Sequence, residues 1–415
     1  MSYTSKKVVT ILEKEIGDVG SHLYLKTCEE IGVDPQTVGA DDLIRLLGPL
    51  TERVAFFGKE KAARVYEKVE KIVKKTGVKM DIEKIIAKAE AAKNAGKTKD
   101  VLGLLLPELN TIQNAPPEQK IRFHSLLGDA FLREGDKEKS KKHYDLVLGE
   151  AKKLGDEKRL AEALQGLGMV YWRMGKYPEA KKALEDALRH AEKTDDHALV
   201  GRIYMALANV HDEWGQVEKA LEYSAKSREH LIKGHDKKSL ATLYNNMGVV
   251  YARRELFHKS LEYYQQCVEI AREIGYHMME GWALFNAAED LARMKKYEEA
   301  LEHCKRSEEI FTNLRDKLGL SGVYMSYAIT YWLMGDMDRA EKYFQKTVDL
   351  RKKLGMPYRT ADALYEMGRF YMEKQDLKKA KKALEESLKI FTELGNTERS
   401  AQVQQALLEL QNLKQ

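Results

Sequence analysis

The stretch NNMGVVY at residues 245–251 decides the fold, because its small residue Gly248 belongs to a series that recurs every 40 residues. Steps of 40 from Gly248 in either direction meet only glycine or alanine: Gly128, Gly168, Ala208, Gly248, Ala288, Ala328 and Gly368. We call each of these residues the anchor of its repeat. A register held over seven repeats without insertion or deletion predicts an array of structural repeats rather than one globular core.

Other positions of the repeat indicate what each copy should form. The residue three places after the anchor is usually aromatic, and the residue twelve places after it is always alanine or serine. The residue seven places after it is most often glycine, in the series Gly135, Gly175, Gly215, Glu255, Lys295, Gly335 and Gln375. A small anchor on the apolar face of a helix lets a second helix approach, and glycine tolerates the positive φ that ends a helix. Each repeat is therefore predicted to be a helical hairpin that stacks on its neighbours.

The composition favours a helical protein and argues against several functional classes. Among the 415 residues, 33% are charged and only seven are proline, and the net charge is +5. Such a balance is not typical of a dedicated nucleic-acid-binding protein. No signal-peptide stretch opens the chain, no run approaches the about 20 apolar residues that span a bilayer, and the three cysteines lack disulfide or zinc spacing. We expect a soluble cytoplasmic protein without a membrane segment.

The repeat pattern resembles the tetratricopeptide repeat (TPR) family. The segments that carry the resemblance are LGMVYWRMGKYPEAKKALEDAL at 167–188, MGVVYARRELFHKSLEYYQQCV at 247–268 and MGRFYMEKQDLKKAKKALEESL at 367–388. The usual period of the family is about 34 residues. The 40-residue form is similar to the repeats of kinesin light chains, spindle-orientation adaptors and Rap-type regulators. The resemblance implies an all-α fold, a right-handed α-solenoid of about seven to eight TPR hairpins.

The period also predicts where the repeats begin. Residues 118–396 hold the seven clear repeats. Residues 82–115 are interpreted as a degenerate first TPR unit, in which Ala89 and Gly96 keep the spacing between anchor and turn. Because a solenoid repeat buries its apolar face only against a neighbour, this extra unit would cover the start of the array.

The two ends of the chain do not follow the period. Residues 397–415 are predicted to form a helix that caps the last repeat, as solenoids require for solubility. Residues 1–76 are predicted to form a separate helical bundle of unknown role, because Gly, Pro and Asp divide them into short amphipathic segments. The helices expected in this bundle cover 6–16, 19–31, 40–57 and 60–76.

No catalytic signature is present in the sequence. The HExxH motif, the P-loop, the nucleophile elbow and the Rossmann glycine fingerprint are all missing. Several histidines, among them His197, His235 and His277, fall near the turns between repeats, where they are most simply exposed turn residues. We expect no enzyme activity, no metal site and no cofactor, so function should reside on the surface of the array.

Asparagines recur at positions that should line the groove of the array. Groove positions lie on the first helix opposite its core face, six and two residues before the anchor and one and five residues after it. Three successive repeats place Asn209, Asn246 and Asn286 there, with Asn245 at the border. An amide both donates and accepts, which suits pairing with the backbone of an extended peptide. The alternative is that these amides connect adjacent repeats or meet water.

The TPR resemblance assigns roles to three of these asparagines. In the long-repeat relatives, an asparagine before the small anchor contacts the backbone of a bound peptide, and Asn246 and Asn286 occupy the matching place. Asn209 follows its anchor and matches instead the clamp asparagine that related chaperone-adaptor repeats use for a terminal carboxylate. The resemblance therefore implies a peptide or protein partner.

Arginines recur five places after the anchor, at Arg133, Arg173, Arg253 and Arg293. Arg202 joins them from the position six before the anchor, and Trp282 and Phe285 are the nearby candidates for an apolar pocket. Because guanidinium groups bind carboxylates in bidentate pairs, we expect a partner with an acidic segment or a C-terminal carboxylate. The alternative is that the arginines pair with Glu213, Glu289 and their neighbours.

Two functions follow from these expectations. The leading hypothesis is a scaffold or adaptor that binds a peptide or partner protein in the concave groove. The second is a ligand-responsive signalling regulator, whose solenoid changes curvature and signals through the N-terminal domain. A weaker third hypothesis is that the arginines bind phosphate or nucleic acid, and a steep loss of affinity with salt would distinguish it.

Overall fold

The computed structural model describes residues 3–38, 42, 46, 49–51, 53–75, 82–94 and 96–413, and the regular structure within them is helical throughout. The first helices of the repeats are α7 (Pro117–Glu134), α9 (Glu157–Arg173), α11 (His197–Glu213), α13 (Lys237–Ala252), α15 (His277–Arg293), α17 (Lys317–Met334) and α19 (Pro357–Glu373). The second helices are α8 (Lys137–Leu154), α10 (Tyr177–Ala191), α12 (Val217–Lys233), α14 (Phe257–Glu273), α16 (Tyr297–Asn313), α18 (Met337–Lys353) and α20 (Leu377–Glu393). The predicted all-α fold is confirmed.

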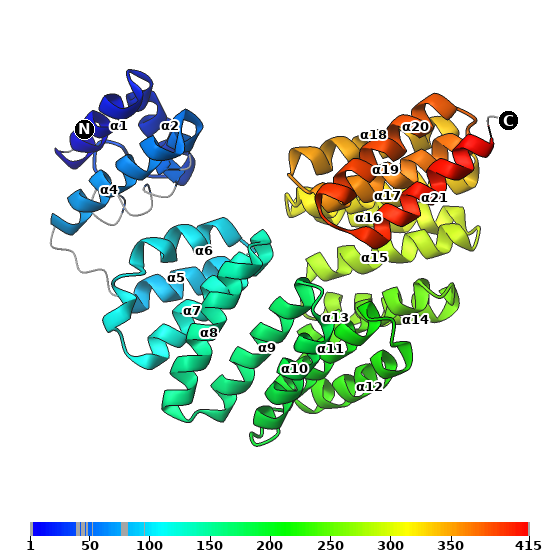
Figure 1. Cartoon of the computed structure of the whole chain (residues 1–415), viewed down its shortest axis with the longest axis horizontal. Coiled ribbons are helices and arrows are strands. Elements are labelled where there is room, and N and C mark those ends of the chain that lie inside the picture. Colours follow the sequence, from blue (N-terminus) through cyan, green and yellow to red (C-terminus); the bar gives the residue numbers. More distant parts are fainter. Residues whose placement is uncertain are drawn as a thin grey trace. The chain divides into compact units, whose positions relative to one another are not determined.

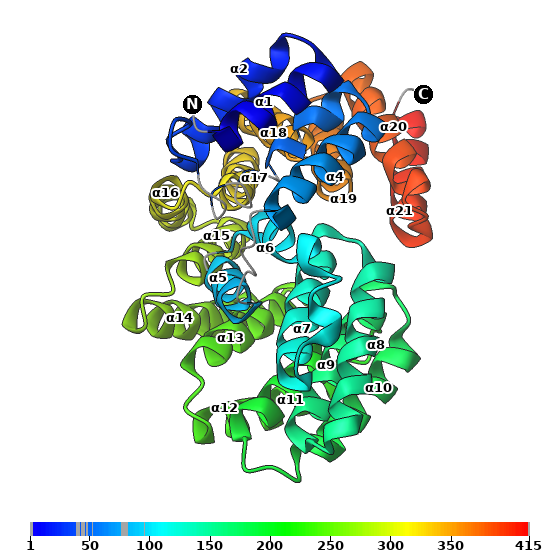
Figure 2. The same ribbon diagram turned by 90° about the vertical axis from the view of Figure 1, so that its left-hand side faces the viewer.

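Each repeat folds as the predicted hairpin. Figures 1 and 2 show α7 beside α8, α13 beside α14 and α17 beside α18. Successive hairpins pack in order, with α14 against α15 and α16 against α17. All seven anchors are buried, and the alanine or serine twelve places after each anchor is at most 1% exposed where a value is given. The predicted solenoid of stacked helical hairpins is confirmed.

The turn inside each hairpin keeps one backbone geometry even where the glycine is missing. Gly135 and Gly215 have φ of 86° and 77°, as predicted for residues that end a helix. Glu255, Lys295 and Gln375 occupy the same place with φ of 59°, 63° and 62°. A non-glycine residue in this left-handed region carries a cost on the order of 1 kcal/mol. The stacking of the hairpins therefore sets the turn, and glycine only makes it less strained.

The anchor is small because a side chain of the second helix lies directly against it. A Cβ atom added to Gly248 would lie 2.4 Å from the ring of Tyr264, and one added to Gly128 would lie 2.8 Å from Tyr144. The residue sixteen places after the alanine anchors Ala208 and Ala288 is the smaller Ser224 or Cys304, whereas the residue sixteen places after Ala328 is Phe344. Anchor and facing residue together thus set the distance between the two helices of a hairpin.

The segments before and after the seven repeats are also helical. Before them lie α1 (Tyr3–Ile16), α2 (Val19–Ile31), η1 (Ala55–Phe57), α4 (Lys59–Lys75), α5 (Ile82–Asn94), α6 (Thr98–Leu105), η2 (Leu106–Glu108) and η3 (Ile112–Asn114). After them α21 (Thr397–Asn412) packs against α20. Of the expected helix over 40–57, residues 40–41, 43–45, 47–48 and 52 lie outside the described residues, and its end forms η1. In residues 82–115, interpreted above as a degenerate unit, Ala89 is fully buried and Gly96 has φ of 73°.

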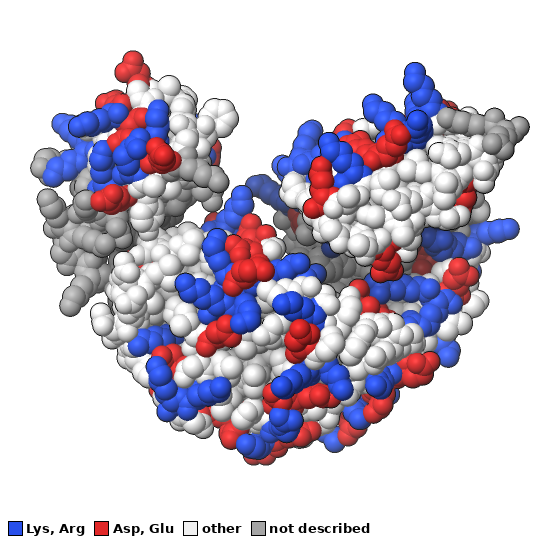
Figure 3. All heavy atoms as spheres, viewed as in Figure 1, with Lys and Arg blue, Asp and Glu red and all other residues white. Residues whose placement is uncertain are grey.

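The chain divides into two compact units, Met1–Leu199 and Val200–Gln415, and the division falls within α11. All of the predicted partner-binding residues except Arg173 belong to the second unit. Basic and acidic side chains are mixed over the face seen in Figure 3, in keeping with the small net charge of +5. In the described ranges no helix combines the length and the apolar character needed to cross a membrane.

Candidate functional site

Two amide hydrogen bonds link the first helices of three successive repeats. Asn246 on α13 donates through Nδ2 to Oδ1 of Asn209 on α11 at 3.2 Å. Asn286 on α15 donates in the same way to Asn245 on α13 at 3.1 Å. The alternative that the amides connect adjacent repeats therefore describes all four side chains. Among the described residues, Asn246 and Asn286 each make this one side-chain hydrogen bond as donor, so one N–H and the Oδ1 of each can meet a further partner.

The four asparagines differ in exposure. Asn245 is only 7% exposed and lies in the interior of the stack, which corrects its placement at the border of the groove. The physical reason is the helical turn of about 100° per residue, which rotates Asn245 away from Asn246 toward the core. Asn209, Asn246 and Asn286 are half-buried, so part of each amide remains at the surface.

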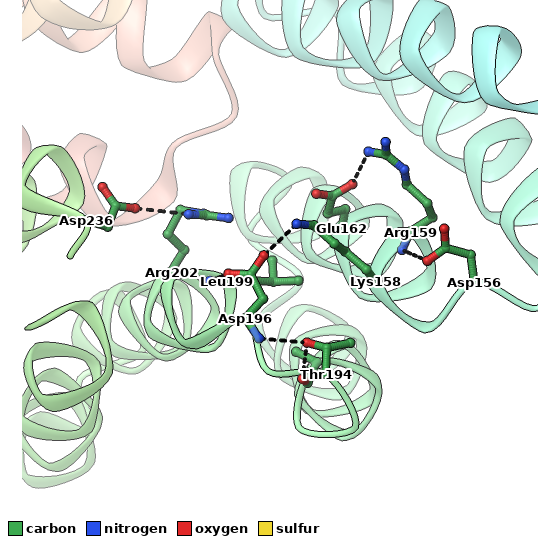
Figure 4. Close-up of polar contacts among 10 residues, drawn as sticks. Asp156, Lys158, Arg159, Glu162, Thr194, Asp196, Leu199, Arg202 and Asp236 are labelled. Atoms are coloured by element: carbon green, nitrogen blue, oxygen red, sulfur yellow. Dashed lines mark hydrogen bonds and ion pairs between the residues drawn. The ribbon is translucent and has the colours of Figure 1, made fainter. Parts of the chain in front are cut away.

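Arg202 has a structural partner. Its Nη1 lies 3.0 Å from Oδ2 of Asp236, and Figure 4 shows this ion pair between α11 and the start of α13. Asp236 is also the N-cap of α13, because its Oδ1 accepts from the backbone N–H of Ser239 at 3.0 Å. Arg202 thus neutralises a capping carboxylate of the next repeat, and this contact occupies one end of its guanidinium group.

Arg253 is also paired, and its partners come from the preceding repeat. Its Nη1 lies 2.9 Å from Oδ2 of Asp212, and its Nη2 lies 3.2 Å from Oε1 of Glu213. The side chain of Asp212 is only 11% exposed. The alternative of ion pairing with Glu213 is therefore observed for Arg253. We call this contact the 212–253 junction.

Arg293 stands one repeat later at the position of Arg253, but without an acidic partner of this kind. The residues 40 and 41 positions before it, which correspond to Glu213 and Asp212, are Arg253 and Ala252. Within the part of the chain that the structure describes, no carboxylate lies within 4.0 Å of the exposed Arg293 guanidinium. We call this place the 252–293 junction.

A pocket of about 360 Å³ opens at the 252–293 junction. Its polar wall carries Arg253, Arg293 and Asn286, and the apolar wall comes from Phe257 and Tyr264. The remaining lining residues are Val249, Ala252, Glu255, Glu289 and Asp290. A volume in this range is typical of sites that hold small ligands or single side chains, and the lining of this pocket is more polar than apolar.

Two carboxyl groups of the pocket are bound by serines. Ser260 Oγ donates to Asp290, which is 4% exposed, and Ser326 Oγ donates to Glu289 at 2.9 Å. Burial raises the pKa of Asp290 from its usual 3.8 to about 6. Burial also raises the pKa of Glu289, while the hydrogen bond from Ser326 and the charge of Arg293 oppose that shift. Together with the exposed Glu255, three carboxyl groups and two arginines line the pocket, and the raised pKa values of Asp290 and Glu289 reduce the negative charge that these acids carry there.

The remaining predicted residues serve the packing of the repeats. Trp282 is partly buried against the core of the second unit. Phe285 fills the space above Gly322 of the next repeat, where an added Cβ atom would lie 2.9 Å from its ring. In the first unit, Arg173 stacks on Trp172, with its guanidinium carbon 4.7 Å from the ring centroid. Within the second unit the structure therefore brings together Arg253, Asn286 and Arg293, and Arg173 belongs to the first unit.

Two features of the site were not found in the sequence. Ala252 was passed over because it is a small residue at the end of α13, and Asp290 because it follows a groove position on the core side. A comparison of the residues 40 and 41 places before each arginine could have found Ala252, because the acid present before Arg253 is missing before Arg293. That comparison needs the distance between hairpins, which the repeat period alone does not give.

The helical hairpins, their constant length and their stacking define an α-solenoid repeat protein. The tetratricopeptide repeat model matches overlapping windows at residues 121–193, 159–233, 239–313, 280–353 and 319–393. The chain belongs to the tetratricopeptide repeat family. No curated protein matches it in sequence.

Several solved structures share the fold. The quorum sensor NprR from B. thuringiensis, in its apo form, is 13% identical with a TM-score of 0.59, over 85% of this chain and 97% of NprR. Apo RapI is 17% identical with a TM-score of 0.56, over 66% of this chain and 99% of RapI. A Rap protein complexed with competence and sporulation factor is 15% identical with a TM-score of 0.52, over 90% and 98% of the two chains. Identities this low show likeness of fold alone.

Proposed function

We propose that this chain is an interaction module that binds a peptide or partner protein at the 252–293 junction, where Arg293 holds a carboxylate of the partner. The repeat family and the fold support the broader role of a protein-interaction adaptor or regulator. The choice of site and of ligand charge rests on the residues of the second unit alone.

The observation that carries the proposal is the contrast between two equivalent arginines. Arg253 has two carboxylates at 2.9 and 3.2 Å, whereas exposed Arg293 has none within 4.0 Å among the described residues and lines a pocket of about 360 Å³. A guanidinium group presents several N–H donors in one plane, a geometry that matches a carboxylate. A carboxylate bound to Arg293 would take its hydrogen bonds from that residue, because Nη1 and Nη2 of Arg253 already face Asp212 and Glu213.

The amides beside the pocket can hold the rest of such a partner. Asn286 lines the pocket and uses one N–H for Asn245, so its second N–H and its Oδ1 can meet a peptide backbone. Asn246 has the same capacity one repeat earlier. Because both amides are already oriented by their neighbours, less side-chain entropy would be lost when a peptide binds.

A second candidate function is a ligand-responsive regulator. The likeness of fold to the NprR quorum sensor and to a Rap protein bound to competence and sporulation factor favours it. In this form of the proposal the same carboxylate site receives the signal. Hydrogen exchange in residues 1–76 with and without a captured peptide separates the two functions, because only a regulator requires a response there.

The site is tested with a peptide array in which every sequence is presented twice, once with a free C-terminal carboxylate and once with a C-terminal amide. Wild-type protein and the Arg293→Gln variant are compared, and Arg228→Gln on the exposed side of α12 is the matched control. We expect wild type and Arg228→Gln to capture the same peptides and Arg293→Gln to lose them. Peptides captured only through internal Asp or Glu residues would also be kept in the amidated series, which separates an acidic segment from a C-terminus.

Equal capture by Arg293→Gln and wild type would overturn the site. If peptides without acidic residues were captured equally with a free and with an amidated C-terminus, the proposal that Arg293 binds a carboxylate would be wrong. The variant protein must remain folded, and its circular dichroism and melting temperature establish this directly. Because Arg293 makes no ion pair with the described residues, its substitution should leave the melting temperature nearly unchanged.

A further inference from the structure

We propose that Ala252 is the specificity-determining residue of this site, because its methyl side chain leaves room for a partner's carboxylate where Asp212 places an internal one at the preceding junction. The inference rests on the proposed carboxylate site. It goes beyond that site by assigning the selectivity to a residue with no polar side chain.

At the 212–253 junction, an aspartate of the chain itself occupies the space beside the arginine. Asp212 is 41 residues before Arg253, and its Oδ2 lies 2.9 Å from Nη1 of Arg253. Its Oδ1 also lies 3.5 Å from Nη2 of Arg254, so the carboxylate meets two guanidinium groups. Asp212 is 11% exposed in this position, so no room is left there for an external anion.

The same separation in sequence recurs further along the second unit. Trp332 Nε1 donates to Oε2 of Glu373 at 2.9 Å, and these two residues are also 41 positions apart. A contact between a residue four places after one anchor and a residue five places after the next is therefore a regular feature of the stacked hairpins. Because the repeat length is constant, Ala252 and Arg293 must face each other in the same way.

The pocket lies where this geometry predicts it. Ala252, Arg253 and Arg293 all line it, and no carboxylate of the described residues lies within 4.0 Å of Arg293. Of the three pocket acids, Glu289 and Asp290 come from α15 itself and are held by serine hydroxyls, and the exposed Glu255 lies in the turn after α13. An alanine in place of an aspartate thus converts an internal ion pair into a site that is open to an external carboxylate.

The inference is tested by supplying the missing acid within the chain. The Ala252→Asp variant is compared with Ala252→Asn, which has the same shape but no charge. Each substitution is also combined with Arg293→Gln. The melting temperatures of wild type, the single variants and the double variants then form a double-mutant cycle. The probe for binding is the free-carboxylate peptide that wild type captures most strongly from the array.

We expect Ala252→Asp to raise the melting temperature relative to Ala252→Asn, and this gain to disappear in the Arg293→Gln background. We also expect Ala252→Asp to lower the affinity for the peptide at least tenfold, while Ala252→Asn binds it within a few-fold of wild type. The two results together would show that the internal acid and the peptide compete for one guanidinium group.

Absence of coupling between positions 252 and 293 would overturn the inference. Full coupling with unchanged peptide affinity would overturn it too, while leaving the proposed binding function in place at another site. If wild type shows no carboxylate-dependent capture at all, the proposed function fails and the inference fails with it. The melting-temperature cycle tells these cases apart, because it requires no ligand.

Discussion

The 212–253 and 252–293 junctions are built from the same repeat yet present opposite chemistry. In the first, Arg253 is bound by two carboxylates of the preceding repeat. In the second, Arg293 holds the same position, and Ala252 and Arg253 stand where the acids would be. The comparison indicates that the repeat period determines where side chains lie. Binding depends instead on single residues that differ between neighbouring repeats.

The hairpins that supply the two junctions differ in packing as well. The first pairs anchor Ala208 with Ser224, and the second pairs Gly248 with the buried ring of Tyr264. Tyr264 forms part of the pocket floor at the 252–293 junction. The larger side chain thus replaces volume that the smaller anchor gives up, and it lines the same pocket as Arg293.

The largest effect is expected from Gly248→Ala, which breaks the packing of the second hairpin. The added Cβ atom would lie 2.4 Å from the Tyr264 ring, so the ring or the helices must move. We expect a loss of about 1–3 kcal/mol in the free energy of unfolding, measured by denaturant titration. Gly103→Ala on α6 is the control, because nothing lies within 4 Å of its added Cβ atom. Equal stability of both variants would contradict this account of the anchor.

A smaller loss in the free energy of unfolding is expected when the hydrogen bond between Asn286 and Asn245, beside the 252–293 junction, is removed. Asn286→Ala removes the donor to Asn245, which is 7% exposed and has little access to water in compensation. We expect about 1–2 kcal/mol of destabilisation. Asn246→Ala should cost less, because its acceptor Asn209 is half-buried and can bind water instead. The reverse order in a denaturation experiment would show that the two amide links have other roles.

Removing the carboxylate of Asp212 should make the 212–253 junction resemble the 252–293 junction. Asp212→Ala leaves Arg253 with only Glu213, at 3.2 Å. Arg253 is 53% exposed, so we expect a cost of only about 0.5–1 kcal/mol. Calorimetry with the captured peptide should then detect a second, weaker carboxylate site. A stoichiometry that stays at the wild-type value would mean that the arginine alone does not create a site.

The smallest expected effect is a pH dependence of peptide binding. Asp290 lies near Arg293, Arg253, Glu289 and Tyr264, and burial raises its pKa to about 6. When the pH falls from 7.5 to 5.5, Asp290 takes up a proton, the pocket loses negative charge, and a carboxylate ligand should bind roughly fivefold more tightly. Isothermal titration at the two pH values measures this, and Asp290→Asn should flatten the profile. A tighter complex at pH 7.5 would contradict it.

The same pKa shift has a consequence for stability. The folded-state pKa of Asp290, about 6, lies above its usual 3.8, so the folded chain binds this proton more tightly than the unfolded chain. The resulting stabilisation is present below about pH 3.8 and is lost as the pH rises through about 6. Asp290→Asn should therefore gain stability relative to wild type at pH 7.5, and this gain should shrink as the pH falls through the same window.

The sequence predicted the repeats well because each depends on local chemistry. The spacing of anchor and turn gave the hairpins, and the helix expected over 19–31 agrees with α2 (Val19–Ile31) because Asp18 and Gly32 mark its ends. The positive φ at Glu255 could not be read from its residue type, since stacking imposes it. The sequence offered the pairing of Arg253 with Glu213 only as an alternative, and it did not predict the pairing of Arg253 with Asp212 or of Arg202 with Asp236, because these partners belong to other repeats.

The central claim is that Arg253 is already bound and Arg293 is available, and arginine side-chain NMR tests it most directly. Exchange of the Nη–H protons of each arginine with water is followed in the free protein and after addition of the captured free-carboxylate peptide, because Arg253 is paired through Nη1 and Nη2. We predict slower exchange at Arg253 than at Arg293 in the free protein, and a marked slowing at Arg293 alone when the peptide is added. Equal protection of both arginines before addition, or no change at Arg293 in the complex, would contradict the account.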